Sequence, residues 1–193
     1  MVPLIVLFLN VAVAQSVNLA PIGEHYPVLI IEKNENPQNL MVAYIQLDRE
    51  CRLVNNPRDP KQPMFDYYWL MDGARYKPVH PLIKAGIRSR LAFQTRDKDD
   101  RGFTLRFNDL SELHQDLPDR TVHVEALKSG STCRVEARLA LGPSDGGKIL
   151  KIRRIYSVAS KTFLPPFRRI RSVTLKGALL SGDTPFERTY KAM

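Results

Sequence analysis

The stretch TCRVEARLAL, residues Thr132–Leu141, decides the fold class. Apolar side chains occupy every second position from Cys133 to Leu141, and the positions between them are mainly polar or charged. Successive side chains of a β-strand point to opposite faces of a sheet, so this alternation predicts a strand with one buried face. Burial on one face is typical of antiparallel sheets, because helices cover both faces of most parallel ones.

The same alternation recurs on both sides of this stretch. It runs through Val42–Leu53, where Arg49 is an exception on the apolar face, and through Phe103–Phe107 and Val122–Ala126. Runs rich in β-branched and aromatic residues bring the total to about eight predicted strands. These additional strands are Val28–Glu32, Asp66–Met71, Leu150–Val158 and Val173–Leu180.

One segment, Pro81–Leu91, has apolar residues at helical spacing and a proline at its start, which predicts a short helix. Three segments rich in Asn, Pro and Asp predict loops, and loops on a rigid sheet often carry binding residues. They are Asn34–Asn39, Asn55–Pro63 and Arg96–Arg101. We therefore expect a mainly β fold, an antiparallel β-sandwich or open β-barrel of about eight strands with one short helix.

The N-terminal residues 1–14 are uncharged, largely apolar, and end in Ala12-Val13-Ala14. A small-x-small ending of this kind predicts a secretory signal peptide that is cleaved before Gln15. The alternative is a buried hydrophobic strand or helix. Residues 15–193 are then a single β-rich domain, because their length suits one hydrophobic core. Cleavage of the leader would place the protein in the periplasm or outside the cell.

Positive charge is concentrated near the C-terminus. Nine Lys and Arg residues and no acidic residue lie between Gly146 and Gly182, and these nine equal the formal net charge of +9 of the whole chain. The two prolines within Thr162–Phe167 cannot lie inside a sheet ladder, so this segment predicts a connection. Lys148–Ser160 and Ile170–Gly182 would then be the two strands of a basic hairpin.

Such a hairpin would attract anionic partners, and the attraction would weaken with added salt. For an exported protein the expected partner is an anionic lipid, a glycan or an envelope protein, and no specific nucleic acid. The alternative is that these charges only solvate the strand faces. The predicted binding residues are Arg153, Arg154, Lys161, Phe163, Phe167, Arg168, Arg169 and Arg171.

A second candidate site combines carboxylate, amide and aromatic side chains. This combination suits sugars and other polar ligands, because rings stack on aromatic faces and hydroxyl groups bind carboxylates and amides. The alternative is a buried Trp in the sheet core with surface ion pairs beside it. The members of this predicted ligand cluster are Glu32, Asn34, Asp66, Tyr68 and Trp69.

The two cysteines, Cys51 and Cys133, both fall on the apolar faces of their predicted strands. In an oxidising compartment they could form a disulfide, and the alternative is two buried free thiols. The four histidines lack metal-ligand spacing, so we expect no metal site and no cofactor. A G-x-S-x-G nucleophile motif is also absent from the sequence, and no catalytic residue is assigned.

Several segments together resemble a known family. They are YPVLIIEKNENPQNLMVAYIQLD, FDYYWLMD, the short helix, and the C-terminal LKGALLSGDTPFERTYK. Across Tyr26–Tyr190 this combination is similar to an uncharacterised, mostly exported bacterial family, the domain of unknown function 4833. The resemblance implies a β-rich exported domain and implies no activity.

Two functions follow as hypotheses. The first is a non-catalytic exported β-domain that binds an anionic envelope component or partner protein through the basic hairpin. The alternative is an envelope glycan or peptide hydrolase that uses Glu32, Asp66 or another carboxylate pair. An enzyme needs titratable groups that converge in a cleft, and nothing in the spacing indicates convergence, so binding is favoured. Enzymatic activity and the oligomeric state stay open.

Overall fold

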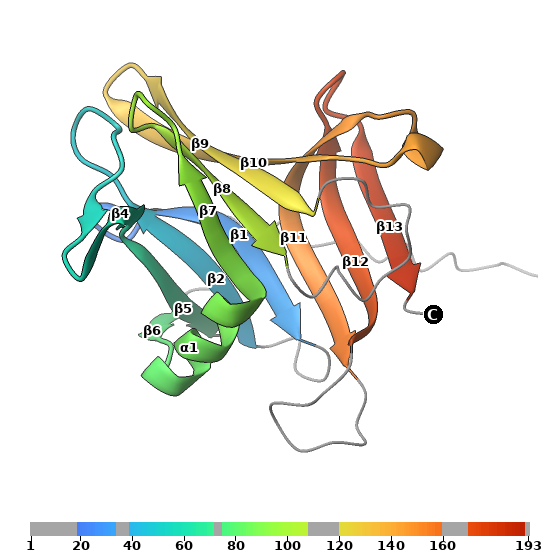
Figure 1. The fold of residues 1–193 in the computed structure, drawn as a ribbon, viewed down its shortest axis with the longest axis horizontal. Coiled ribbons are helices and arrows are strands. Elements are labelled where there is room, and N and C mark those ends of the chain that lie inside the picture. The colour runs from blue at the N-terminus through green and yellow to red at the C-terminus, as the bar shows by residue number, and fades with distance from the viewer. Residues whose placement is uncertain (1–18, 34–38, 72–74, 108–119, 160–169, 192–193) are drawn as a thin grey trace, which may run out of the picture.

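The computed structural model describes residues 19–33, 39–71, 75–107, 120–159 and 170–191. These residues form a mainly β fold with one α-helix, α1 (Pro81–Arg90), as the sequence predicts (Figure 1). The strands are β1 (His25–Lys33), β2 (Asn39–Gln46), β3 (Asn55–Asn56), β4 (Asp59–Pro63), β5 (Phe65–Met71), β6 (Arg75–Pro78), β7 (Leu91–Arg96), β8 (Gly102–Phe107), β9 (Thr121–Ser129), β10 (Thr132–Ala140), β11 (Ile149–Ala159), β12 (Ile170–Leu179) and β13 (Pro185–Lys191).

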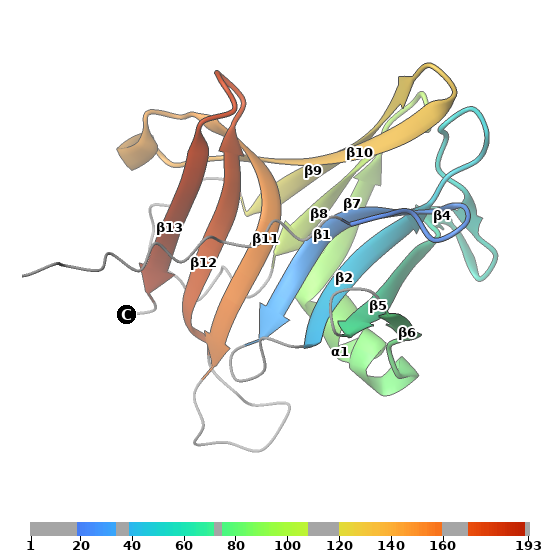
Figure 2. The ribbon, with the colours of Figure 1, turned by 180° about the vertical axis from the view of Figure 1, so that it is seen from behind.

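Strand β11 is the point at which the main sheet divides. Its first half, Ile149–Ile152, pairs with β10, and its second half, Arg154–Ser157, pairs with β1. From β1 the sheet continues through β2, β5 and β6, and from β10 it continues through β9, β8 and β7. The two arms face each other, while β12 and β13 extend from the opposite edge of β11 (Figures 1 and 2).

The result is an open, sandwich-like sheet that does not close into a barrel. The expectation of an antiparallel sheet is correct for every strand pair in the described residues except one. Strands β1 and β11 run parallel, so the sheet is mixed. A parallel pair requires a long crossover connection, and the chain from β1 to β11 supplies one that contains nearly the whole of both arms.

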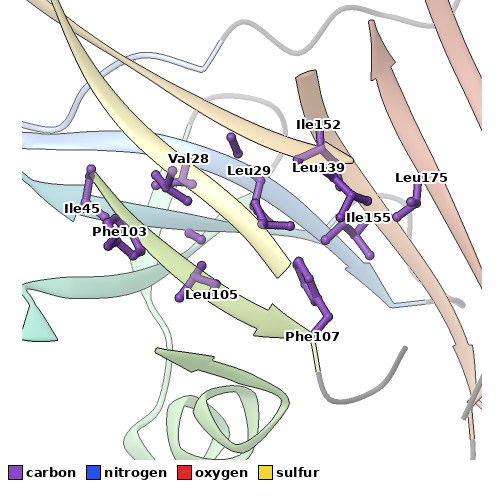
Figure 3. Close-up of a cluster of buried hydrophobic side chains, with 14 of the residues drawn as sticks. Val28, Leu29, Ile45, Phe103, Leu105, Phe107, Leu139, Ile152, Ile155 and Leu175 are labelled. Carbon is purple, nitrogen blue, oxygen red and sulfur yellow. The ribbon is translucent and has the colours of Figure 1, made fainter. Parts of the chain in front are cut away.

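The hydrophobic core lies between the two arms (Figure 3). Val28 and Leu29 of β1 face Leu139 of β10 and Phe103 of β8, and all four side chains are at least nine-tenths buried. The alternation predicted for Thr132–Leu141 is confirmed, because Ala137, Leu139 and Leu141 face this core. Each large apolar side chain buried in this way contributes roughly 1.5–3 kcal/mol to folding.

Strand β2 departs from the predicted one-sided pattern. Its inward residues Ala43 and Ile45 join the main core, but Tyr44, which the predicted alternation places on the solvent side, is also fully buried, as is Val42. They form a second cluster on the outer face of the sheet, against which the N-terminal residues Leu19 and Ile22 pack. The prediction of a polar outer face is therefore wrong for this strand.

The hydroxyl of Tyr44 donates a hydrogen bond to the Ala20 carbonyl oxygen at 3.3 Å. Burial, and then the neighbouring hydroxyls of Tyr76 and Tyr68, raise the pKa of Tyr44 well above its ordinary value of 10.0. In the unfolded chain the phenol ionises near pH 10, whereas in the folded chain it stays neutral. This linkage lowers the free energy of unfolding as the pH rises past 10.

We expect Tyr44→Phe to reduce this alkaline loss of stability. The free energy of unfolding of both proteins is measured in urea at two pH values, one unit below and one unit above the ordinary tyrosine pKa of 10.0. The wild type should lose more free energy of unfolding between the two conditions than the variant does. An equal loss in the two proteins would show that Tyr44 ionises normally in the folded state.

The predicted strand Val42–Leu53 is too long, because β2 ends at Gln46 and the chain then turns. The carboxylate of Asp48 accepts hydrogen bonds from the backbone N–H groups of Glu50 and Arg52, both at 2.8 Å. Asp side chains commonly form turns in this way. Cys51 therefore lies in a turn, with a positive φ of 60°, and not on the face of a strand.

Helix α1 connects the two arms, because it follows β6 and leads directly into β7 (Figure 1). The predicted helix is confirmed, but its apolar face is not: Ile87 is buried, whereas Leu82 is 78% exposed. No described helix has the length and apolarity needed to cross a membrane. Five strands escape the sequence analysis, because they are short or carry mainly polar residues. They are β3, β4, β6, β7 and β13.

Candidate ligand-binding site

A pocket with a volume of about 450 Å³ lies where the β3–β4 hairpin meets β5 of one arm and β7 and β8 of the other. This volume falls within the range of roughly 300–1,000 Å³ that small-molecule sites occupy. The lining residues are Asn56, Arg58, Asp59, Gln62, Pro63, Phe65, Tyr67, Ala92, Phe93, Phe103 and Leu105.

Aromatic rings from both arms form the inner wall of the pocket. Phe65 lies edge-on to Tyr67, with ring centroids 5.1 Å apart, and edge-on to Phe103 at 6.1 Å. Phe93 stacks on Phe103 at 6.2 Å. The alternation of side chains along a strand explains the arrangement, because Phe65 and Tyr67 are two positions apart on β5 and point to the same face.

Polar side chains of the β3–β4 hairpin form the other side of the pocket. The amide oxygen of Asn56 accepts a hydrogen bond from the backbone of Arg58 at 3.0 Å, and Asp59 accepts one from Lys61 at 3.2 Å. The side chains of Arg58 and Gln62 form no hydrogen bond or ion pair within the described part of the chain. One guanidinium and one carboxylate give this side of the pocket a formal charge of zero.

Arg96 at the end of β7 fastens this hairpin to the second arm. Its Nη2 donates a hydrogen bond to the Leu53 carbonyl oxygen at 2.7 Å, and its Nη1 donates to the side chain of Asn55. The backbone N–H of Leu53 in turn donates to the Asp100 carbonyl oxygen at 2.7 Å. Because Arg96 also pairs with Asp100 at 2.8 Å, the start of the hairpin is held by several contacts together.

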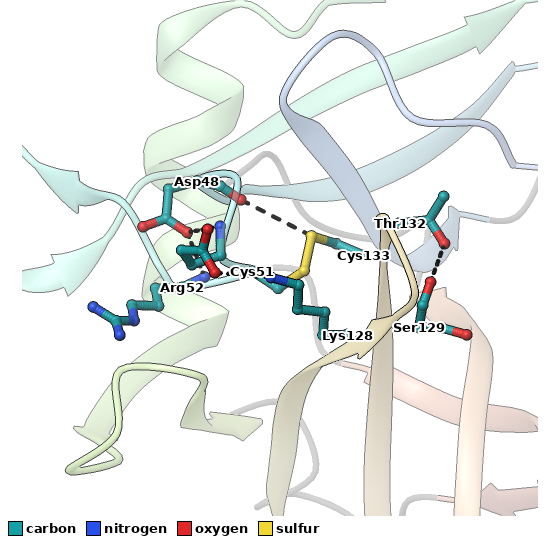
Figure 4. The surroundings of a disulfide bond; sticks show 8 residues. Asp48, Cys51, Arg52, Lys128, Ser129, Thr132 and Cys133 are labelled. Atoms are coloured by element: carbon teal, nitrogen blue, oxygen red, sulfur yellow. Dashed lines mark hydrogen bonds and ion pairs between the residues drawn. A yellow bond between two sulfur atoms is a disulfide. The ribbon is translucent and has the colours of Figure 1, made fainter.

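A disulfide between Cys51 and Cys133 anchors the turn that precedes the hairpin (Figure 4). Their Cα atoms are 5.5 Å apart, and the bond joins this turn to the beginning of β10. The sequence left open whether these cysteines are bonded, and the structure has them bonded. Beside the bond, Lys128 of β9 pairs with Glu50 at 2.8 Å, and this contact lowers the pKa of Glu50 below its ordinary value.

The structure does not gather the predicted ligand cluster into one site. Trp69 packs against the main core, whereas Tyr68, its neighbour on β5, faces the outer cluster. The ring centroids of Tyr68 and Tyr44 are 5.4 Å apart. Asp66 shares this outer side, and burial followed by the charge of Asp66 raises the pKa of Tyr68. Adjacent strand residues ordinarily point to opposite faces, and here Trp69 faces the main core while Tyr68 faces the outer cluster, so the two side chains lie on different sides of the sheet.

The two carboxylates of the predicted cluster form separate ion pairs. Glu32 of β1 pairs with Arg154 of β11 at 2.9 Å, and Asp66 pairs with Lys84 of α1. Each carboxylate therefore has a structural partner on a neighbouring element. The remaining member of the cluster, Asn34, lies outside the described residues.

The predicted basic hairpin exists as the pair β11 and β12, but much of its described charge is neutralised. Lys151 pairs with Asp183 at 3.2 Å, and Lys176 pairs with Glu187 at 3.0 Å. Of the predicted binding residues, Arg154 is ion-paired as described above, while Arg153 and Arg171 are exposed and have no ion pair within the described ranges. The other predicted residues, which lie outside those ranges, are Lys161, Phe163, Phe167, Arg168 and Arg169.

The pocket is not evident from the sequence, because its parts come from distant segments. The sequence predicts a loop over Asn55–Pro63, where binding residues often lie, and places Phe103 on a buried strand face. Nothing in the sequence indicates that this loop lies over Phe93 and Phe103. The signal that could have linked them is the cysteine pair, because a bond between Cys51 and Cys133 restricts where the loop can lie.

Comparison with known proteins identifies no relative. No protein-family model, no curated protein and no solved structure matches this chain. The resemblance to the domain of unknown function 4833 therefore stays a prediction. Among the described residues, no group of three or more His, Cys, Asp or Glu side chains is placed to hold a metal ion.

Proposed function

We propose that this chain is a non-catalytic binding domain that holds a small ligand in the pocket between the β3–β4 hairpin and the two arms. The observation that carries the proposal is the composition of the pocket, an aromatic inner wall opposite a polar hairpin. Small-molecule sites typically combine a mainly apolar surface with a few placed polar groups that orient the ligand. The disulfide and Arg96 support the proposal, because they hold the polar side in place before a ligand arrives.

Binding is favoured over hydrolysis by the groups that the pocket contains. Glycoside hydrolysis ordinarily uses two carboxyl groups separated by roughly 5–9.5 Å. Asp59 is the one carboxylate among the described residues that line the pocket, and no histidine, cysteine, serine or threonine accompanies it there. The carboxylates suggested for a hydrolase, Glu32 and Asp66, are each paired with a basic side chain instead.

Binding of an anionic envelope component through the basic hairpin stays a prediction. The exposed Arg153 and Arg171 are the described residues that support it. The ion pairs of Arg154, Lys151 and Lys176 reduce the net positive charge that this surface presents. Periplasmic or secreted localisation is likewise proposed, and the disulfide supports it because such bonds persist in oxidising compartments.

Screening a small-molecule fragment library by protein-observed NMR tests the proposed function. We expect binders to shift the backbone signals of Ala92 and Phe93 and the side-chain amide of Gln62. Phe93→Ala should weaken their binding roughly tenfold, because it removes the ring that stacks on Phe103.

The matched control is Tyr76→Ala, which removes a partly exposed aromatic ring that packs in the outer cluster and does not line the pocket. This variant should bind the same fragments with unchanged affinity, and circular dichroism establishes that both variants are folded. Fragments that shift signals only outside the pocket, or no binding fragments at all, would contradict the proposal.

A further inference from the structure

We infer that the ligand of this pocket is an uncharged saccharide, bound through the faces of its sugar rings. The inference rests on the proposed function and specifies the ligand class. Three properties of the lining lead to it: aromatic rings on one side, uncommitted hydrogen-bonding groups on the other, and a balanced charge.

The aromatic side suits the apolar face of a sugar ring. Phe65 and Phe93 are partly exposed, while Phe103 behind them is fully buried and supports both rings. The face of an aromatic ring carries partial negative charge and attracts the weakly positive C–H groups of a pyranose. A flexible fatty chain would gain from the rings as well, but it would leave the opposite side of the pocket without hydrogen bonds.

The hairpin side suits hydroxyl groups. The amide of Gln62 offers two donors and an acceptor, and the guanidinium of Arg58 offers donors. Neither side chain is committed to a partner within the described ranges. Because a sugar hydroxyl both donates and accepts, it can satisfy these groups and the nearby Asn56 and Asp59 together.

The lining contains one positive and one negative side chain, Arg58 and Asp59, which disfavours a strongly ionic ligand. A carboxylate or phosphate attracted by Arg58 would be repelled by the neighbouring Asp59. A cation attracted by Asp59 would be repelled by Arg58. Like charges brought together in this way oppose binding. An uncharged ligand meets neither penalty, so a neutral saccharide fits better than a uronic acid or a sugar phosphate.

Titration of the wild-type protein with neutral disaccharides tests the inference, with the NMR signals of Gln62 and Phe93 as the readout. The panel contains hexose and N-acetylhexosamine disaccharides together with the uronic acid counterpart of one of them. We expect at least one neutral disaccharide to shift both signals and its uronic acid counterpart to bind more weakly.

Gln62→Ala should weaken binding of that disaccharide by about tenfold, the usual effect of losing one good hydrogen bond. Gln94→Ala is the matched control, because Gln94 is exposed, lies next to Phe93 on β7 and does not line the pocket. Its disaccharide affinity should equal that of the wild type. Equal affinities of the Gln62 and Gln94 variants would overturn the inference.

The outcomes separate this inference from the proposed function. If fragments shift the pocket signals but no neutral disaccharide does, or if the uronic acid binds more tightly, the saccharide inference is wrong and the binding function stands. If neither fragments nor disaccharides shift these signals, both proposals fail.

Discussion

Removing the disulfide by Cys51→Ser together with Cys133→Ser is expected to lower the free energy of unfolding by about 4.5 kcal/mol. The bond joins residues 82 positions apart, so its loss frees a large loop in the unfolded chain and favours that state. A domain of this size has a total stability of roughly 5–15 kcal/mol, so the variant should be close to unfolding at 37 °C. Chemical denaturation of both proteins under non-reducing conditions measures the difference.

The same double variant should also bind pocket ligands more weakly. The disulfide anchors the turn that begins at Asp48, and the β3–β4 hairpin follows this turn directly. Without the bond, the hairpin would depend on the remaining contacts, which include those of Arg96 and the backbone hydrogen bonds of Leu53 and Val54. Lys128→Met is the control, because it removes the neighbouring ion pair with Glu50 and leaves the disulfide intact.

This control should leave stability and ligand binding nearly unchanged, because the ion pair is exposed. Treating the wild type with a reductant should reproduce the effects of the double variant. Equal denaturation midpoints for the oxidised wild type and the double variant would show that the bond does not stabilise the fold.

Replacing Phe103 by alanine is expected to cost roughly 3–5 kcal/mol, because it leaves a cavity in the centre of the core. Phe103 is fully buried, lies 6.1 Å from Phe65 and stacks on Phe93. The loss should come with weaker ligand binding, since both partner rings line the pocket and would lose their support.

Urea unfolding monitored by circular dichroism measures the effect of Phe103→Ala on stability. Phe103→Leu should cost less, because it retains most of the buried volume. Leu82→Ala is the control on an exposed apolar residue, 78% accessible on α1, and should change stability by less than about 0.5 kcal/mol. A cost for Phe103→Ala as small as that of the Leu82 variant would contradict the assignment of this core.

The sequence predicts elements whose burial pattern is local. The alternation in Thr132–Leu141 and in Phe103–Phe107 correctly identifies β10 and β8, because each strand buries one face. The spacing of Pro81–Leu91 correctly predicts the position of α1, although Leu82 on its expected apolar face is exposed. In these segments the period of the apolar residues is set by the local geometry of the backbone.

The pattern fails where burial depends on distant parts of the chain. Tyr44 looks like a solvent-facing residue, but the N-terminal residues Leu19 and Ile22 cover it. The division of β11 between β10 and β1 is equally invisible, since the sequence of a strand does not show which neighbour each half pairs with. Burial alternates along the edge strand β13, but Arg188 occupies the inward position between Phe186 and Tyr190, so the sequence shows no apolar alternation there.

The compensation of charge between strands is also invisible in the sequence. The window between Gly146 and Gly182 contains no acidic residue, so the sequence suggests an uncompensated basic surface. Sheet pairing then places Glu32 of β1 next to Arg154 and Glu187 of β13 next to Lys176. Cross-strand neighbours, which are distant in sequence, decide the net charge of a sheet surface.

The pocket could be predicted only in its parts. The prediction of a core residue is correct for Phe103, but the segment Asn55–Pro63, predicted as a loop, forms the β3–β4 hairpin instead. Their meeting depends on the disulfide, on Arg96 and on the way the two arms diverge from β11. These are tertiary features, which explains why the candidate site emerges from the structure and not from the sequence.

The most direct test of the central claim, that a ligand binds between the hairpin and the two arms, is to fill the pocket. Gln62 lines it from β4 and its side chain has no partner within the described residues, so Gln62→Trp would place a large ring in the space without altering the disulfide. The compound that most strongly shifts the Gln62 amide signal of the wild type is then titrated into this variant, and its affinity is measured. We predict a folded protein that no longer binds the compound, whereas wild-type affinity in a folded variant would show that the pocket is not the binding site.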